Sequence, residues 1–287
     1  MSIDEFAEHQ KASGMKVRKL GGVWWAEVRP FFFRPVFPFT ALDPDDVRYP
    51  SRSWIGGVLH AVGPGVVPNS RMNLFVYEDL KNYSLSVLGD KHRNITRKGI
   101  KNFTARRIND PAEFIRDAYE VYLSFYERTR YRYKSERLIK RNFASWAQEL
   151  FSSGKVFVLG AYRNNKLSAV DISYHVENII YDDVFFSDSE SLSFKVTDFM
   201  LHTLREHAAA SGAQYLYRGL PTGKPSLDAS KLTRGVRVLE LPACCRLNPF
   251  ALFAVKLIMK ESYNKLMGLT GPPKSSLNAG FASGSLP

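Results

Sequence analysis

Three apolar segments follow one another at short spacing between Lys155 and Phe186, and a helical pattern comes directly after them. The segments read KVFVLGAY, KLSAVDISYHV and IIYDDVFF, and each is rich in β-branched and aromatic residues. Because only short turns separate them, they predict an antiparallel meander. Apolar periodicity over 195–210, ended by Gly212, then predicts a helix, and QYLYRG predicts another strand. A meander that leads into strand, helix and strand requires a mixed sheet.

Two helices are predicted before the meander. Asp110, Pro111 and Glu113 form a helix start, with Asp110 as the N-cap and Pro111 at the first helical position. This helix is expected to run to about residue 130, and Ser135 is expected to cap a second helix through Phe151. These helices give the mixed sheet a cover on both faces.

Strands and a loop complete the order. FTARRI is predicted to be a strand, 220–235 a Gly/Pro-containing loop and VRVLEL a final strand. The order over 103–241 is therefore β-α-α-β-β-β-α-β-loop-β, which places the chain in the α/β (α+β) class. A further helix is predicted at 90–102, and Gly99 suggests that it ends near that point.

The 287 residues have room for one large domain or two small ones. The expected organisation, from the N-terminus, is a flexible segment, a β-rich region with a basic helix, the core, an amphipathic helix and a disordered tail. Their ranges are 1–20, 21–102, 103–245, 246–270 and 271–287. The apolar face of the final helix is expected to pack on the domain, although its lysines would also suit peripheral membrane contact.

Basic charge is concentrated in one part of the chain. The net charge is +12, and residues 91–140 hold 14 Lys/Arg against 6 Asp/Glu. Residues 91–107 hold seven basic and no acidic side chains. A field of this sign attracts a polyanion, such as RNA, a phosphorylated cofactor, an acidic carrier protein or an anionic lipid surface, although a solvated helix face is an equal alternative.

Other classes of protein find no support. Cys244 and Cys245 are adjacent, which disfavours a mutual disulfide and provides no metal-ligand spacing. The N-terminus lacks the apolar region of a secretory signal, and the early apolar run 31–39 is too short to span a bilayer. We therefore expect a cytoplasmic protein with no metal site and no transmembrane segment.

Three pieces of the sequence, in order, resemble the GNAT superfamily, in particular FemAB-type peptidoglycan aminoacyltransferases and bacterial leucyl-tRNA–protein transferases. NLFVYEDL followed by KHRNITRKGIKNFTARRI is similar to their strand and Arg-rich helix, and IIYDDVFF through QYLYRG is similar to their strand–helix–strand unit. Residues 228–235, DASKLTRG, are similar to their Y-K-x-x-F-G motif, with Ser230 and Arg234 in the aromatic places. The resemblance covers about 75–241 and implies a GNAT-type mixed twisted sheet, preceded by a partial N-terminal GNAT-like half.

One departure bears on the acyl donor. GNAT acetyltransferases hold the pyrophosphate of coenzyme A with a glycine-rich loop before the central helix, where backbone N–H groups and the helix dipole bind the anion. Residues 187–193 occupy that place here, with no glycine and with the carboxylates of Asp188 and Glu190. Aminoacyl-tRNA-dependent relatives also lack the glycine loop. The resemblance therefore favours aminoacyl-tRNA as donor over acyl-CoA or acyl-carrier protein, with no tightly bound cofactor.

The resemblance also suggests site residues. It places Lys231 near the reacting carbonyl and the donor phosphates. Lys224, Arg234 and Arg237 are close to it in the sequence and could bind phosphates or a carboxylate, with a basic surface loop as the alternative. The base is expected among Asp182 and Asp183, with Asp171 on the preceding strand as a further candidate. Alternation puts Asp183 on one face of its strand and Asp182 on the other; one should face a cleft, unless both make structural salt bridges.

The basic helix is expected to engage the phosphates of the donor through Arg93, Arg97, Lys98 and Lys101. The resulting function is an acyltransferase that moves an acyl or aminoacyl group from an activated carrier to a small-molecule or peptide amine. One alternative is an acyl-CoA or acyl-carrier-protein dependent N-acyltransferase that makes an N-acyl amino acid or lipid. The other is a non-catalytic GNAT scaffold that binds RNA or a membrane.

Overall fold

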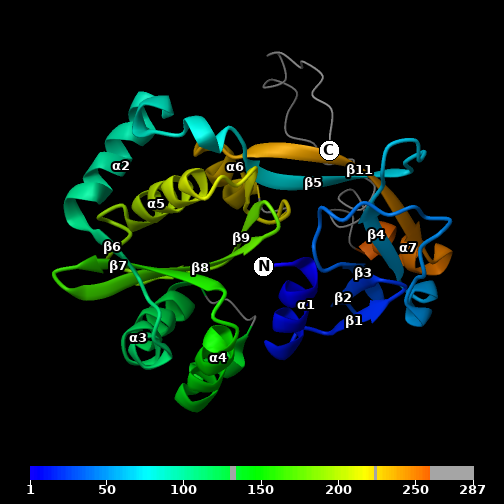
Figure 1. Cartoon of the computed structure of the whole chain (residues 1–287), viewed down its shortest axis with the longest axis horizontal. Helices are drawn as coiled ribbons and strands as arrows, with labels where there is room; N and C mark the ends of the chain where they lie inside the picture. Colours follow the sequence, from blue (N-terminus) through cyan, green and yellow to red (C-terminus); the bar gives the residue numbers. More distant parts are fainter. Residues whose placement is uncertain (130–133, 223–224, 259–287) are drawn as a thin grey trace.

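The computed structural model describes residues 1–129, 134–222 and 225–258, and its strands form one eleven-stranded sheet (Figure 1). The strand order is β1-β2-β3-β4-β11-β5-β10-β9-β8-β7-β6. The strands are β1 (Val17–Leu20), β2 (Val23–Arg29), β3 (Phe32–Pro35), β4 (Gly57–Ala61), β5 (Ser70–Tyr77), β6 (Thr104–Arg107), β7 (Val156–Arg163), β8 (Lys166–Val176), β9 (Ile179–Ser187), β10 (Tyr215–Tyr217) and β11 (Arg237–Leu247). The mixed sheet expected from the element order is confirmed.

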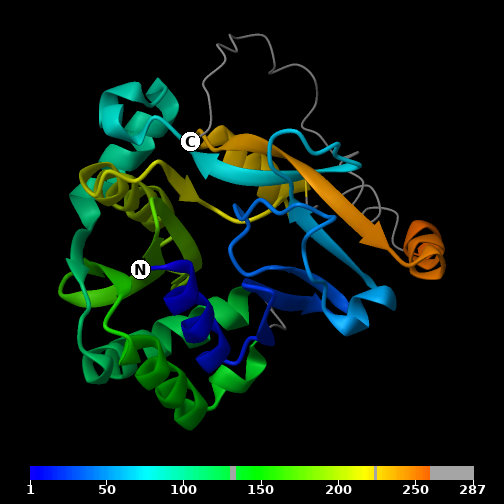
Figure 2. The same ribbon diagram turned by 45° about the vertical axis from the view of Figure 1, so that its right-hand side comes forward.

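Helices cover both faces of the β6–β10 half. The α-helices are α1 (Ile3–Ala12), α2 (Asp90–Asn102), α3 (Pro111–Thr129), α4 (Lys140–Ser152), α5 (Val196–Ala210), α6 (Pro225–Thr233) and α7 (Pro249–Ile258). In both views α3 and α4 lie on one face of this half, and α5 and α2 lie on the other (Figures 1 and 2). The main hydrophobic core joins α3 and α4 to the sheet through Phe114, Phe143 and Ile172, all fully buried.

The helix signals before the meander are confirmed in part. The Asp110 carboxylate accepts hydrogen bonds from the backbone N–H groups of Ala112 and Glu113, at 3.0 and 3.2 Å, as an N-cap does. Ser135 instead begins a short 3₁₀ turn, Ser135–Leu138, and α4 starts only at Lys140. Lys134, in the left-handed backbone conformation, precedes this turn, so Ser135 lies inside the turn and is not its cap.

Residues 1–20 do not form the loosely ordered segment that their polar composition suggested. They form α1 and β1, and the Ser2 hydroxyl and Glu5 carboxylate make a reciprocal capping box. α1 buries Phe6 and Ala7 in the main core, between the two halves of the sheet (Figure 1). These apolar side chains, with hydrogen bonds from Trp24 to Asp4 and between His9 and Tyr174, hold the segment on the sheet although its composition is polar overall.

One further expectation is corrected. The loop expected at 220–235 contains α6, which begins at Pro225, so the Gly/Pro content of the segment concealed a helix. The helix predicted at 90–102 is confirmed as α2, Asp90–Asn102, and it runs past Gly99. A Cβ at Gly99 would lie 2.8 Å from Phe199 Cβ, so this glycine permits close contact between α2 and α5 and does not terminate a helix.

β11 connects the two halves of the sheet. It pairs antiparallel with β5 from Arg237 to Ala243 and with β4 from Ala243 to Leu247. A strand late in the chain therefore lies between two strands of the N-terminal region. This arrangement makes the N-terminal half continuous with the half that carries α5.

α7 follows β11, and its large apolar side chains do not pack as expected. Phe250, Phe253 and Leu257 are all exposed, so these side chains do not pack on the domain. Of the helix expected over 246–270, the structure describes the part up to Ile258. The rest of that range and the tail expected over 271–287 lie outside the described residues. Among the described residues, none of the helices has the length and apolar content needed to cross a bilayer.

Candidate functional site

The parallel pairing of β9 and β10 ends abruptly in the middle of the sheet. It covers only Tyr215↔Ile179 to Tyr217↔Tyr181, while β9 continues to Ser187. After Tyr217 the chain remains hydrogen-bonded to β5, where the Arg218 N–H donates to the carbonyl of Phe75 at 2.7 Å. The two strands therefore separate, and the open part of β9 begins at Asp182. We call this part of the sheet the β9–β10 opening.

A β-bulge at Asp183 sets the directions of the side chains at the opening. Ser173 pairs with Asp182 and Ile172 with Val184, so Asp183 is an extra residue on β9. The bulge interrupts the alternation of β9 directly after Asp182. Asp182 shares the α5 face with Ile180 and Phe185, as their core clusters show: Ile180 packs with Leu204, and Phe185 with Phe199 and Met200. Tyr181, Val184 and Phe186 pack on the opposite face.

On the α5 face, the polar side chains of Asp182 and Lys231 both contact Arg218. The Asp182 carboxylate forms an ion pair with the Arg218 guanidinium, and both side chains are largely buried. The Lys231 Nζ donates a hydrogen bond to the Arg218 carbonyl at 2.8 Å. Lys231 and Asp182, predicted from separate parts of the sequence, are thus brought together by Arg218. Arg218 was not predicted; its only signal is its place near the end of the predicted strand QYLYRG, directly after β10.

Lys231 extends from α6 into this partly buried environment. Its Nζ lies 5.2 Å from the centre of the Phe75 ring, within the range of a cation–π contact. Desolvation and the nearby Arg218 cation lower the pKa of Lys231 to about 8, against the smaller effect of Asp228. The ammonium is therefore mostly protonated at neutral pH, but it releases its proton more readily than a surface lysine.

Asp171 lies on the same face, one strand further. Its side chain is buried, its Oδ1 has no hydrogen-bond partner, and the neighbouring Ser173 hydroxyl is likewise buried without one. Desolvation raises the pKa of Asp171 to about 7, although the Arg218 cation opposes the shift. The α5 face of the opening thus holds two carboxyl groups of different character, one paired as an anion and one inclined to keep its proton.

Asp183 lies on the other face, toward α1 and the N-terminal half. Its side chain is exposed, and it accepts a hydrogen bond from Gln10 of α1. Desolvation by the surrounding protein raises the pKa of Asp183 to about 6, against the lowering effects of Arg137 and Gln10. The two adjacent carboxylates therefore serve different faces of the sheet, and only Asp183 is open to solvent.

The approach to α5 is occupied by the carboxylates of the chain itself. Asp188 accepts a hydrogen bond from the Ser191 N–H at 2.7 Å, and Glu190 pairs with Arg163 at 2.8 Å. Asp198, in the first turn of α5, accepts from Arg234 Nε at 3.0 Å. The segment before α5 and its first turn thus carry three carboxylates with partners inside the chain, and Arg234 links the end of α6 to α5 through Asp198.

The predicted basic side chains of α2 are mostly turned to solvent. Arg97, Lys98 and Lys101 are exposed, whereas Arg93 is half-buried and pairs with Asp90. Within the described chain, no hydrogen bond or ion pair connects these four to Lys231. Lys224, also predicted to bind phosphate, lies outside the described residues.

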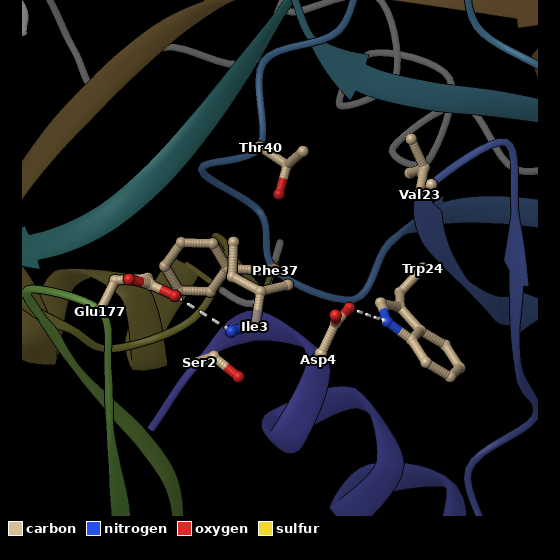
Figure 3. A pocket seen from close by; sticks show the side chains of 9 residues that line it. Ser2, Ile3, Asp4, Val23, Trp24, Phe37, Thr40 and Glu177 are labelled. Carbon is tan, nitrogen blue, oxygen red and sulfur yellow. Dashed lines mark hydrogen bonds between the residues drawn. The ribbon is translucent and has the colours of Figure 1, made fainter.

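A separate cavity of about 300 Å³ lies at the opposite end of β9 (Figure 3). Trp24, Phe37 and Thr40 line it, together with the carboxylates of Asp4 and Glu177. Both carboxylates already accept hydrogen bonds: Asp4 from Trp24 Nε1 at 2.6 Å, and Glu177 from the Ile3 N–H at 3.1 Å. None of the residues predicted from the sequence lines this cavity. No group of three His, Cys, Asp or Glu side chains in the described ranges could hold a metal ion.

The separated parallel strands, the helix between them and the preceding meander define a GNAT-type fold, which confirms the fold class expected from the sequence. Comparison with solved structures agrees. FemX superimposes with a TM-score of 0.59 at 11% identity, covering 88% of this chain and 93% of FemX. The structure of L-PGS from Bacillus licheniformis gives 0.59 at 12% identity, with 92% and 96% covered.

A third solved structure is the C-terminal domain (DUF2156) of an Agrobacterium fabrum protein named for lysylphosphatidylglycerol synthetase. It gives a TM-score of 0.58 at 11% identity, covering 93% of this chain and 98% of that domain. The chain is therefore similar over almost its whole length to FemX and to these two domains, N-terminal half included. No family model and no curated protein matches the sequence.

Proposed function

We propose that this chain is an acyltransferase that moves an acyl or aminoacyl group from an activated carrier to an amine, across the β9–β10 opening. One observation carries the proposal: Lys231 is held half-buried at the opening by the Arg218 carbonyl, beside the Asp182–Arg218 ion pair. The fold shared with FemX and L-PGS supports the same reading. The name lysylphosphatidylglycerol synthetase itself describes an aminoacyl group joined to a phospholipid.

The chemistry follows from the charges on the two faces. Attack of the amine nitrogen on the donor carbonyl forms a C–N bond and places negative charge on the carbonyl oxygen. The Lys231 ammonium would stabilise this oxyanion in a partly dehydrated site, where such an interaction is stronger than in water. The C–O or C–S bond to the carrier then breaks, and the departing atom takes up a proton.

The amine must also lose a proton, and Asp183 is the candidate base. It is exposed on the face opposite Lys231, and its pKa of about 6 leaves it ionised and able to accept a proton at neutral pH. Asp182 is less suited to this role because it is already paired with Arg218. In this scheme the donor approaches from the α5 face and the acceptor from the face of Asp183.

Aminoacyl-tRNA is the favoured donor. Arg97, Lys98 and Lys101 present exposed positive charge along α2, and an extended track of phosphates could follow such a helix. The carboxylates of Asp188 and Asp198 at the approach to α5 disfavour a bound pyrophosphate there. Acyl-CoA and acyl-carrier protein are the alternative donors, and a non-catalytic scaffold is the alternative to an enzyme.

The test is transfer of a labelled amino acid from aminoacyl-tRNA to a panel of amines that includes aminolipids. Lys231→Ala should lower the rate by about 10²–10³-fold, as removal of one oxyanion-stabilising donor does. Lys166→Ala is the control, because Lys166 is an exposed lysine at the far end of β8. An unchanged rate in Lys231→Ala would remove this residue from the mechanism. Transfer from acyl-CoA but from no aminoacyl-tRNA would replace the donor.

A further inference from the structure

Arg34 is a half-buried arginine that has no anionic partner among the described residues. It lies on β3 opposite Ala26 of β2, and because cross-strand partners share a face, its side chain points to the main hydrophobic core. The Arg34 Nε is buried and has no hydrogen-bond partner. No carboxylate of the described residues lies within ion-pair distance of its guanidinium.

Its polar neighbours cannot neutralise this charge. Arg34 interacts electrostatically with Tyr181 of β9 and Tyr217 of β10, whose rings lie 4.9 Å apart at the β9–β10 opening. Burial raises the pKa of Tyr217 to about 12 and that of Tyr181 well above its ordinary value. Both phenols therefore stay protonated and uncharged at neutral pH, and no described residue compensates the guanidinium charge.

Solvent nevertheless reaches this part of the molecule. Arg34 and Tyr181 are only half-buried, and Asp183 on the same face of β9 is exposed. The two tyrosines interact electrostatically with both Arg34 and Asp183, so they lie between a cation from β3 and an anion from β9. A small molecule that carries a nucleophile at one end and an anionic group at the other would match this order of charges.

An arginine that loses hydration without gaining a partner destabilises the folded chain, and a residue of this kind is explained when a ligand supplies the missing charge. We propose that Arg34 binds an anionic group, a carboxylate or a phosphate, of the acceptor whose nucleophile lies at Asp183. The proposal rests on the proposed function in one respect, because that function assigns this face of the opening to the acceptor. The donor is excluded from Arg34 since Lys231 and the Asp182–Arg218 pair lie on the opposite face.

The binding claim can be tested on the whole chain without knowledge of the acceptor. Thermal unfolding is measured in sodium chloride, sodium acetate and sodium phosphate, at one pH and one ionic strength. Acetate or phosphate should raise the midpoint of the wild type above its value in chloride, because a ligand that binds the folded state stabilises it. The anion that gives the larger rise identifies the group as carboxylate or phosphate.

Arg34→Met and Arg52→Met form the matched pair. Arg52 is an exposed arginine in the 3₁₀ turn Ser51–Trp54 and does not act on Arg34, so its removal changes the net charge equally but leaves the opening intact. Arg34→Met should lose the response to both anions and should unfold in chloride at the same or a higher temperature than the wild type, because it removes a charge that has no anionic partner among the described residues. Arg52→Met should keep the wild-type response.

Three results would overturn the proposal: no response of the wild type to either anion, an equal response in Arg34→Met, or a marked fall in the midpoint of Arg34→Met in chloride, which would make Arg34 a structural residue. Failure of the proposed function looks different. In that case no transfer activity is found for any donor, while the Arg34-dependent anion response persists. If transfer is found, Arg34→Met should raise the KM for an anionic acceptor by about tenfold or more with a smaller change in kcat.

Discussion

Lys231 and Asp171 carry charges of opposite sign when ionised, but both side chains lose hydration on the α5 face of the sheet. Burial lowers the pKa of Lys231 to about 8 and raises that of Asp171 to about 7, so each shift favours the uncharged form. Arg218 lies near both, and it adds to the shift of the lysine while it opposes the shift of the aspartate. These two groups therefore give the chain pH-dependent properties that can be measured separately.

We expect transfer activity to fall as the pH rises through about 8, because the proposed role of Lys231 requires the protonated ammonium. In Lys231→Arg the guanidinium stays charged, so this alkaline limb should move upward even if the maximal rate is lower. The measurement is the rate against pH from 6 to about 10 for both proteins. The same alkaline limb in Lys231→Arg would assign it to another group.

Asp171 should make the folded state less stable as the pH rises from about 4 to about 7. The unfolded chain releases this proton near 3.8 and the folded chain near 7, so the stabilisation is complete below the first value and is lost by the second. The loss should be on the order of 3 kcal/mol. Asp171→Asn, which mimics the protonated carboxyl, should flatten this part of the profile in urea unfolding. Parallel profiles for the two proteins would contradict the assignment.

At the scale of elements, the contact between α2 and α5 depends on a missing side chain. A methyl group on Gly99 would lie 3.0 Å from the Lys195 carbonyl as well as 2.8 Å from Phe199 Cβ. Gly99→Ala should therefore lower the free energy of unfolding by about 1–3 kcal/mol, although alanine has the better helix propensity. Gly63→Ala is the control, since no atom lies within 4 Å of the added methyl. A more stable Gly99→Ala would show that the helices can separate without cost.

The elements that could be predicted are those with local signals. Asp110 marks the start of α3 because an N-cap acts on the next three residues, and the β8 strand was predicted with its observed bounds, since it alternates between short turns. The bulge at Asp183 could not be predicted, because it depends on the register with β8. The surroundings of Arg34 could not be predicted either, because they depend on how β3 lies relative to β9, which is distant in the sequence.

The basic residues of the molecule are unevenly distributed, and α2 carries several of them on its exposed surface. If α2 follows tRNA phosphates, reversal of Arg97, Lys98 and Lys101 to glutamate should weaken binding of aminoacyl-tRNA by a large factor and reduce its dependence on salt. Arg93 is left unchanged because it already pairs with Asp90. The control reverses three exposed basic residues on other elements, namely Lys16, Arg52 and Lys166.

Binding is measured at two salt concentrations for both triple variants and for the wild type. Coenzyme A affinity should change little in either variant, since a few phosphates in one pocket do not follow a helix. Equal losses in the two triple variants would mean that tRNA responds only to net charge. Tight binding of coenzyme A by the wild type with no affinity for tRNA would favour the alternative donor.

The position of β11 has a consequence for how the chain comes to be made. A ribosome delivers β4 and β5 early, but the strand that belongs between them emerges only with residues 237–247, after the whole α5 half. Until then, β4 and β5 each have a backbone edge without its partner strand, and such edges are templates for pairing with other chains. The N-terminal half thus cannot complete its sheet until residues 237–247 have been synthesised, and this one strand then joins both halves.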